Sequence, residues 1–287
     1  MMHRAAVVYA VPDVIPSTCL NRPLSFQPGP TAASSWTVHD DHVSLVRSAM
    51  PPRVLHLAAE PQAIEIDLAR TALIVVDMQN DFCHKEGWFA CKGIDVAPMR
   101  KPIVPIASLS NALRTAGARI VWLNWGIRAD RANLPASVLY RGKRSADAAG
   151  YGEISSAGHG PSLVQGTWGA AQLDELPAQA GDISVSKHRL SGFWDSELDS
   201  ILRQAGITTL LFAGINTDRC VFSTLQDAGF LGYDCVLVED ACATPSPPYV
   251  SDAIVFLVRQ LHGFTTTCSN LHTALPFASP PSHKESS

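Results

Sequence analysis

The sequence predicts an α/β fold, a three-layer α/β/α domain built on a doubly wound sheet of six parallel strands. Apolar runs without alternation, such as residues 72–76, are typical of strands that are covered on both faces. These runs alternate with helix-like segments, because parallel neighbours need crossover connections. In addition, Asp77, Lys187 and Cys220 fall at or just beyond the ends of predicted strands, where doubly wound sheets bind their ligands.

The predicted elements follow one another along the chain without internal repeats. The strands are short apolar or β-branched runs, at residues 72–77, 119–124, 182–187, 208–213, 233–239 and 264–267. The helices have one apolar face, and several of them are followed by glycine; they are predicted at residues 102–116, 170–176, 195–204, 221–228 and 248–261. The intervening segment 125–169 is punctuated by glycine and proline, and we expect it to line or cover a pocket.

Three regions are expected along the chain. Residues 1–60 are rich in Pro, Ser, Ala and His and predict a partly irregular N-terminal extension, with one helical turn near residues 40–48. Residues 61–275 form the predicted domain, in which the alternation at 63–68 indicates a short edge strand. Residues 276–287 form a C-terminal tail. No function for the extension follows from its sequence.

The composition excludes several classes of partner. The net charge of −4 arises from 22 basic and 26 acidic residues without long runs of either sign, which argues against nucleic-acid and membrane-surface binding and leaves a small molecule as the expected partner. No apolar run reaches the roughly 18 residues needed to span a bilayer. The seven cysteines are scattered without a Cys-x-x-Cys pair, so a reducing, cytoplasmic location is predicted. A signal peptide in the first twelve residues is the alternative, but no clear cleavage pattern supports it.

Cys220 stands at the centre of a predicted strand–elbow–helix unit. The β-forming run 208–214 is followed by the link 215–219, and Cys220 then enters the first turn of a helix. Unpaired backbone N–H groups and the helix macrodipole at that position favour a thiolate, which is the nucleophilic form of cysteine. The alternative interpretation is an inert core cysteine, as we expect for most of the other six.

Asp77 and Lys187 each have an ordinary structural interpretation as well. A carboxylate that closes a strand often caps the next turn, and a lysine at a strand end is often solvated. Taken together with Cys220, however, they supply a nucleophile, a proton acceptor and a cation that orients both. We therefore predict that Asp77, Lys187 and Cys220 form a catalytic set.

Three sequence blocks carry a resemblance to a known family. TALIVVDMQNDF at 71–82, KHRLSGFWDSELDSIL at 187–202 and LLFAGINTDRCV at 210–221 resemble the signature blocks of the isochorismatase-like cysteine hydrolase superfamily. The resemblance runs from about residue 64 to about residue 274 and looks closest to the ureidoacrylate, biuret and streptothricin hydrolase branches. It implies a strand order of 3-2-1-4-5-6 and the triad Asp77, Lys187 and Cys220.

The same resemblance implies a mechanism. It places a non-proline cis peptide at Ile215–Asn216 and an oxyanion hole at the backbone N–H groups of Asn216 and Cys220. The implied activity is that of a cysteine amidohydrolase, which cleaves a C–N bond of a small amide, carbamoyl, ureido or lactam substrate through a thioester. Relatives of this kind are usually dimers or tetramers, so a homo-oligomer is expected.

Differences between this sequence and known members of the family narrow the expected cofactors and reactions. Nicotinamidases carry a metal site built from one Asp and two His after the second strand, but residues 124–130 contain no histidine. The nearest is His159, in a glycine-rich loop, so neither a metal nor another cofactor is expected. Isochorismatase itself cleaves a vinyl ether without a cysteine nucleophile, and Cys220 argues against that chemistry. A vinyl-ether hydrolase and a catalytically silent interaction module remain the alternatives.

Candidate substrate-binding residues lie near the predicted strand ends. Each of them also fits an ordinary core or surface role; they are Phe82, Asn124, Trp125, Arg128, Phe193 and Trp194. Trp125 and Trp194 are the strongest candidates, because they follow catalytic strands or their loops. An aromatic wall of this kind would stack on a planar amide or urea-like group.

Overall fold

The structure is a computed structural model that describes residues 25–31 and 34–275, and its internal contacts divide the chain into two units, up to Ala49 and from Met50. Within the first unit lies a small antiparallel sheet in the order β1-β2-β3, whose strands are β1 (Ser25–Phe26), β2 (Thr37–His39) and β3 (Val43–Ser44). The prediction of a helical turn near 40–48 is wrong. Val38 pairs with Val43 across a tight turn, because β-branched residues flank a short polar segment that suits a hairpin.

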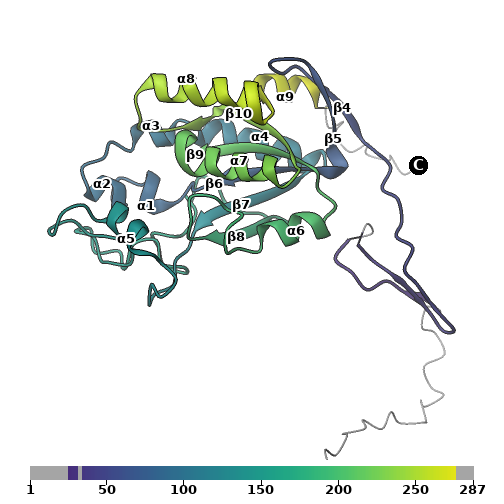
Figure 1. Cartoon of the computed structure of the whole chain (residues 1–287), viewed down its shortest axis with the longest axis horizontal. Coiled ribbons are helices and arrows are strands. Elements are labelled where there is room, and N and C mark those ends of the chain that lie inside the picture. The colour runs from purple at the N-terminus through teal and green to yellow at the C-terminus, as the bar shows by residue number, and fades with distance from the viewer. Residues whose placement is uncertain (1–24, 32–33, 276–287) are drawn as a thin grey trace, which may run out of the picture. The chain divides into compact units, whose positions relative to one another are not determined.

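The second unit is built on a six-stranded parallel sheet (Figure 1). Its order is β11-β10-β9-β6-β7-β8, and every neighbouring pair is parallel. The strands are β6 (Thr71–Val76), β7 (Arg119–Trp125), β8 (Ile183–Lys187), β9 (Thr209–Ile215), β10 (Asp234–Ala243) and β11 (Phe264–Thr266). Read from β8, and with the six strands numbered along the chain, this is the predicted order 3-2-1-4-5-6.

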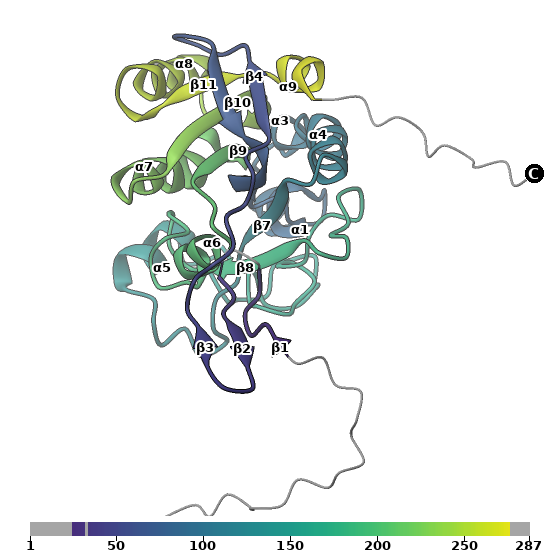
Figure 2. The same ribbon diagram turned by 90° about the vertical axis from the view of Figure 1, so that its right-hand side faces the viewer.

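Helices cover both faces of this sheet. The helices of this unit are α1 (Asn80–Cys83), α2 (Trp88–Cys91), α3 (Ala97–Arg100), α4 (Ile103–Thr115), α5 (Ala136–Gly142), α6 (Leu198–Gln204), α7 (Phe222–Phe230), α8 (Pro248–Leu257) and α9 (Cys268–Ala274). Figure 2 shows α7 and α8 on one side of the strands and α4 and α9 on the other. The architecture is therefore the predicted three-layer α/β/α sandwich.

The two central strands, β6 and β9, are buried along their whole length. They run side by side, with Val76 opposite Gly214, although more than 130 residues separate them in the sequence. The chain continues from β6 to one edge of the sheet and from β9 to the other, so the strand order reverses between them. In doubly wound sheets the carboxyl ends of strands at such a switch point form the ligand-binding crevice.

A short antiparallel pair precedes the main sheet. Here β5 (Ile64–Asp67) pairs with β4 (Val54–Leu57), with Leu55 opposite Ile66. The strand predicted at 63–68 is therefore present, but it belongs to a separate two-stranded sheet and not to an edge of the main one. Alternating burial along β4 explains the pairing, since only one face of this ribbon is covered.

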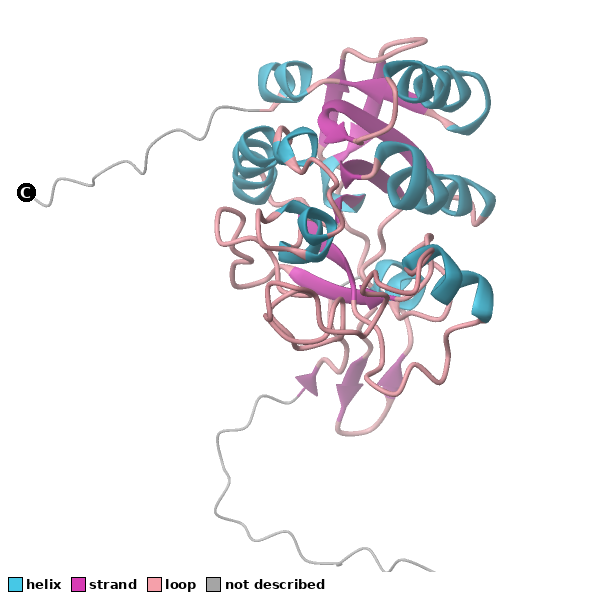
Figure 3. Cartoon of the chain, turned by 90° about the vertical axis from the view of Figure 1, so that its left-hand side faces the viewer, coloured by secondary structure: helices cyan, strands magenta, loops and turns pink. Residues whose placement is uncertain are grey.

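The predicted helix at 170–176 is wrong. Residues 169–173 instead donate and accept backbone hydrogen bonds with the segment that follows β6: the N–H groups of Asn80 and Asp81 donate to the carbonyls of Ala171 and Gly169, and that of Leu173 donates to Met78. These long-range bonds use groups that a helix would have paired internally. Figure 3 shows how much of the chain around the carboxyl ends of the strands is loop.

Other elements differ from the prediction as well. α5 lies inside segment 125–169, for which no helix was predicted. α6 begins at Leu198 and not at 195, because Asp195 has a φ of 55°, which no helix can contain.

Candidate active site

The three predicted catalytic residues meet at the carboxyl edge of the sheet. Asp77 follows β6 directly, Lys187 is the last residue of β8, and Cys220 lies in a π-helical turn, Thr217–Val221, between β9 and α7. Their side chains come from segments as far apart as 143 positions, yet all three residues are buried, with exposed fractions of 2%, 0% and 5%. The parallel arrangement brings these strand ends together.

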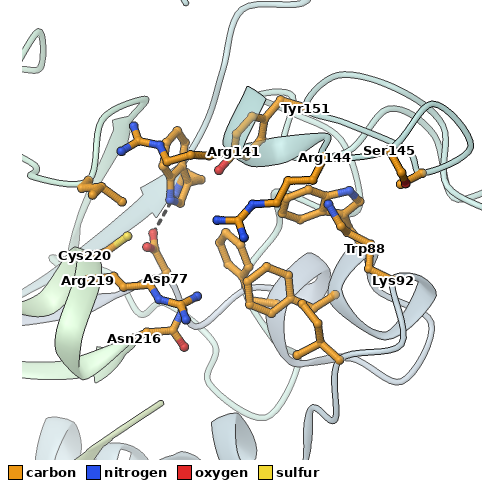
Figure 4. A pocket seen from close by; sticks show the side chains of 16 residues that line it. Asp77, Trp88, Lys92, Arg141, Arg144, Ser145, Tyr151, Asn216, Arg219 and Cys220 are labelled. Carbon is orange, nitrogen blue, oxygen red and sulfur yellow. Dashed lines mark hydrogen bonds between the residues drawn. The ribbon is translucent and has the colours of Figure 1, made fainter. Parts of the chain in front are cut away.

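Asp77 is the hub of this cluster. The Lys187 ammonium donates to its Oδ2 at 2.9 Å. The Trp125 backbone N–H donates to its Oδ1 at 3.1 Å (Figure 4). The Cys220 thiol also lies within hydrogen-bonding range of the carboxylate. Lys187 is held in turn by the Arg189 carbonyl at 3.3 Å and lies 4.4 Å from the centre of the Trp125 ring. One carboxylate therefore contacts both a cation and a thiol.

Burial dominates the electrostatics of this cluster. Desolvation raises the pKa of Asp77, while Lys187 and the hydrogen bonds from Cys220 and Trp125 oppose the rise. Desolvation and the neighbouring Asp77 charge raise the pKa of the Cys220 thiol to about 12, although Lys187 opposes this. This direction opposes the expectation that the helix start favours a thiolate at Cys220. Burial, which is the largest cause, and the neighbouring Asp77 charge both favour the neutral thiol, and Asp77 is its side-chain hydrogen-bond partner.

The elbow before Cys220 has an unusual backbone. The Ile215–Asn216 peptide is cis, as the resemblance implied. Gly214, with a φ of 108°, precedes it at a point where an added Cβ would stand 2.2 Å from the Val76 carbonyl oxygen. Only glycine allows β9 to approach β6 so closely there. The N–H groups of Asn216 and Cys220 remain the predicted oxyanion donors.

Thr224 ties this elbow to the loop after β8. Its hydroxyl donates to the Cys220 carbonyl at 2.6 Å and accepts the N–H of Gly192 at 3.1 Å. The residue is fully buried. A single side chain in the first turn of α7 thus connects the segment that carries Cys220 with the one that follows Lys187.

A cavity of about 670 Å³ opens above the cluster. It is lined by Asp77, Phe82, Trp88, Phe89, Lys92, Ile94, Trp125, Arg141, Arg144, Ser145, Ala148, Tyr151, Leu190, Asn216, Arg219 and Cys220. Figure 4 shows the aromatic and cationic side chains that surround Asp77 and Cys220. Cavities of this size hold small organic molecules.

The cavity contains two of the six predicted substrate-binding residues, Phe82 and Trp125. The other four lie outside its lining. The Arg128 guanidinium is exposed and pairs with Asp130, and the Trp194 indole, 62% exposed, donates to Asp227 at 2.8 Å. Phe193 packs on Tyr233, with ring centroids 5.7 Å apart.

Asn124 also lies outside the lining, half-buried one residue before the end of β7. Because side chains alternate along a strand, Asn124 points to the opposite face of the sheet from Trp125. Trp194 was predicted from its closeness in the sequence to a catalytic strand. It does not line the cavity, because the loop after β8 turns its indole toward α7.

Comparison with known proteins agrees with this geometry. The family model for the isochorismatase domain matches residues 71–270, which is more than half of the chain. The chain belongs to the isochorismatase family.

Solved structures of this family have the same fold. A cysteine hydrolase from Pseudomonas syringae pv. phaseolicola 1448A superposes with a TM-score of 0.61 at 23% identity, covering 78% of this chain and all of the other. N-carbamoylsarcosine amidase from Thermoplasma acidophilum gives 0.54 at 27% identity, covering 69% and 96%. A nicotinamidase/pyrazinamidase from Bacillus subtilis gives 0.56 at 24% identity, covering 69% and 99%. The fold is that of the isochorismatase-like cysteine hydrolases.

Sequence reasoning missed one buried residue that organises this isochorismatase-type site. The Gln79 side-chain amide donates to the carbonyls of Trp125 and Ala170 at 2.8 and 2.7 Å, and its Oε1 accepts the Trp125 N–H at 2.8 Å. It therefore holds the end of β7 and the loop that contains Ala170 in fixed positions relative to each other. The sequence offered one indication of this role, a glutamine two residues after an aspartate that ends a strand. The role itself could not be predicted, because the hydrogen-bond partners of Gln79 are 46 and 91 positions away.

Further cavity residues that the sequence did not predict lie between residues 88 and 151. Trp88 and Tyr151 line the cavity, and so do Arg141 and Arg144 at and beyond the end of α5. No periodic pattern in the sequence marks them, since their placement depends on loop folding. Asp81 helps to hold this region by accepting the backbone N–H groups of Trp88 at 3.1 Å and Leu163 at 2.6 Å.

His159 does not reach the cavity. Its ring contacts Trp168, with centroids 4.2 Å apart, and its Nε2 lies 2.8 Å from a carboxylate oxygen of Glu86. Across residues 25–31 and 34–275, no group of three or more His, Cys, Asp and Glu side chains is arranged to hold a metal ion. In the same part of the chain, no helix is both long and apolar enough to cross a membrane.

Proposed function

We propose that this isochorismatase-family protein is a cysteine amidohydrolase that cleaves a C–N bond of a small amide, carbamoyl, ureido or lactam substrate. The observation that carries the proposal is the buried carboxylate of Asp77, which contacts the Lys187 ammonium on one side and the Cys220 thiol on the other. A related fold at 27% identity belongs to an N-carbamoylsarcosine amidase, which supports amide-type chemistry.

In the first half of the proposed reaction, Asp77 accepts the Cys220 proton as the sulfur attacks the carbonyl carbon. Its raised pKa suits a carboxylate that must take a proton and later return it. The substrate oxygen becomes negative and is met by the N–H groups of Asn216 and Cys220, each worth about 3–4 kcal/mol in such sites. Asp77 then protonates the nitrogen, the C–N bond breaks, and ammonia or an amine leaves a thioester on Cys220.

In the second half, water replaces the departed amine. Asp77 removes a proton from this water, the hydroxide adds to the thioester carbonyl, and the C–S bond breaks as Cys220 regains its proton. Lys187 keeps the carboxylate ionised between the two halves and fixes its orientation. None of these steps requires a cofactor.

Two other functions fit the site less well. A vinyl-ether hydrolase would not need the thiol, whereas Cys220 lines the cavity beside a proton acceptor. A silent interaction module would not need an ammonium, a carboxylate and a thiol buried together, because burying charges is costly unless they are used or well paired.

The test is ammonia release across biuret, ureidoacrylate, N-carbamoyl amino acids, nicotinamide and streptothricin-type lactams. We expect at least one to be hydrolysed, and we expect Cys220→Ala and Asp77→Asn each to retain less than about one thousandth of the wild-type kcat. Intact mass spectrometry under substrate should show the acyl adduct on the wild type and not on Cys220→Ala.

Lys187→Met should also abolish turnover. It should in addition destabilise the fold by about 3–5 kcal/mol, because it leaves the Asp77 carboxylate buried and unpaired. Circular dichroism and urea unfolding of all three variants separate lost chemistry from lost folding. Wild-type turnover in folded Cys220→Ala or Asp77→Asn would refute the proposed triad.

A further inference from the structure

The cavity has a strongly positive lining in a chain whose net charge is −4. Four cationic residues line it: Lys92, Arg141, Arg144 and Arg219. Asp77 is the one acidic residue among the described residues of this lining, and its charge is already matched by Lys187. Clefts lined by one sign of charge concentrate ligands of the other sign.

Two of these cations have partners within the protein. The Lys92 ammonium donates to the Gly142 carbonyl and lies 4.5 Å from the centre of the Trp88 ring. The Arg219 guanidinium lies 3.6 Å from the carboxylate of Asp218. These contacts explain why the two side chains are placed where they are without any ligand.

Arg141 and Arg144 are different. Both are exposed, and within the described ranges 25–31 and 34–275 neither guanidinium group has an ion-pair or hydrogen-bond partner. Figure 4 shows the Arg144 side chain extending from the rim into the space between Trp88 and Asp77. Burial, and then the Arg144 charge, lower the pKa of Lys92, so the repulsion between these cations is felt inside the cavity. An anionic ligand would relieve it.

The walls between the rim and the cluster are aromatic. Trp125 and Tyr151 stack with centroids 5.3 Å apart, Trp88 lies 5.1 Å from Tyr151, and Phe82 and Phe89 are adjacent at 4.8 Å. Such surfaces accept a flat, largely apolar group. From its base to its rim, the cavity therefore has three zones. A thiol and a carboxylate lie at the base, aromatic side chains form the walls, and unpaired guanidinium groups lie at the rim.

We propose that the cavity selects amide or carbamoyl derivatives of carboxylic acids, with the substrate carboxylate bound by Arg144 and its C–N bond facing Cys220. This inference rests on the amidohydrolase function proposed above. The orientation follows from charge, since Asp77 and Lys187 neutralise each other at the base, whereas the guanidinium groups at the rim attract a carboxylate. A guanidinium also matches a carboxylate in a two-point geometry that an ammonium cannot reproduce.

The turnover test uses the carbamoyl amino acid that gives the highest rate in the ammonia screen, together with its methyl ester, which lacks only the negative charge. The wild type should prefer the acid in kcat/KM by about tenfold to a hundredfold, as expected for hydrogen bonds to a charged group. Arg144→Gln should remove most of this preference by raising KM for the acid, with little change for the ester, and Arg144→Lys should restore part of it.

Arg119→Gln is the matched control, because Arg119 is an exposed arginine at the start of β7, on the opposite edge of the sheet from the cavity. It should leave the preference unchanged. Equal turnover of acid and ester by the wild type, or an equal effect of Arg144→Gln on both, would overturn the anion site while leaving the amidohydrolase proposal intact.

A binding test does not depend on turnover. Trp88 and Trp125 line the cavity, so tryptophan fluorescence of the Cys220→Ser variant can report the binding of phenylacetate and of methyl phenylacetate. Phenylacetate should bind about tenfold or more tightly than the ester, and Arg144→Gln should abolish the difference. If phenylacetate binds more tightly than its ester but no amide is hydrolysed in the ammonia screen, the anion site is supported and the amidohydrolase proposal is refuted. Equal binding of the two probes would overturn the anion site.

Discussion

Asp77 carries an unusual combination of properties for a single residue. It is buried, its φ is 53°, and it accepts hydrogen bonds from an ammonium and a backbone N–H while lying in hydrogen-bonding range of a thiol. Aspartate tolerates a positive φ better than most residues do, yet such a conformation persists only when the surroundings hold it in place. The contacts with Lys187 and Trp125 provide that support.

The protonation of Cys220 can be measured by alkylation with iodoacetamide. A thiol with a pKa near 12 is protonated throughout the neutral range, so its labelling rate should rise about tenfold per pH unit from pH 7 to pH 10. Asp77→Asn removes the neighbouring negative charge but keeps Lys187, so the thiol pKa should fall and the rate should level off at a lower pH. Mass spectrometry of the labelled peptide gives both curves.

Cys91 provides an internal reference for this measurement. Its thiol is partly exposed and, although burial opposes the change, hydrogen bonds with Ser156 and Ser155 lower its pKa. It should therefore be labelled before Cys220 at pH 7. A rate for Cys220 that does not change between pH 7 and pH 9 would mean that the resting site holds a thiolate and a protonated Asp77, contrary to our assignment.

At the scale of single elements, the close approach of β6 and β9 decides where Cys220 stands. Val76 and Gly214 face each other in register, and the elbow with its cis peptide begins at the next residue. Thr224 then anchors the start of α7 to the loop after β8. The nucleophile is thus positioned by contacts between elements, to which the Thr224 hydroxyl contributes.

Gly214→Ala tests this element contact. The added methyl group would collide with the Val76 backbone, which cannot move without disturbing the central sheet, so we expect the free energy of unfolding to fall by about 2–4 kcal/mol. Gly229→Ala is the control. It lies within α7, where the nearest atom to an added Cβ is 3.8 Å away, and it should stabilise by up to about 1 kcal/mol. Urea unfolding that ranks the two variants alike would contradict this account.

At the scale of the whole molecule, self-association remains a prediction. Exposed apolar side chains occur on α7, on α8 and on the turn after α8, with exposed fractions of 72% for Phe230, 71% for Tyr249, 61% for Phe256 and 71% for Leu261. Groups of exposed apolar side chains are typical of interaction surfaces.

We expect sedimentation velocity to give the mass of a dimer or tetramer of the 30.8 kDa chain at micromolar concentration. Phe256→Glu should lower the assembled fraction, because it would place a charge in an apolar contact. Val104→Glu is the control: Val104 is also exposed, at 76% against 61% for Phe256, but it lies on α4, on the other side of the sheet. A monomer at all concentrations would refute the prediction.

The sequence by itself determined the order of elements, the parallel sheet and the positions of Asp77, Lys187 and Cys220 at strand ends. These properties depend on local patterns, since buried parallel strands require uninterrupted apolar runs and their carboxyl ends share one edge. Tertiary structure alone decided the rest. Burial raised the pKa of Cys220, and long-range backbone bonds replaced the helix expected at 170–176. Loop folding placed Trp88, Tyr151 and Arg144 in the cavity and turned Trp194 away from it. Each of these outcomes depends on partners far away in the chain, which no local pattern encodes.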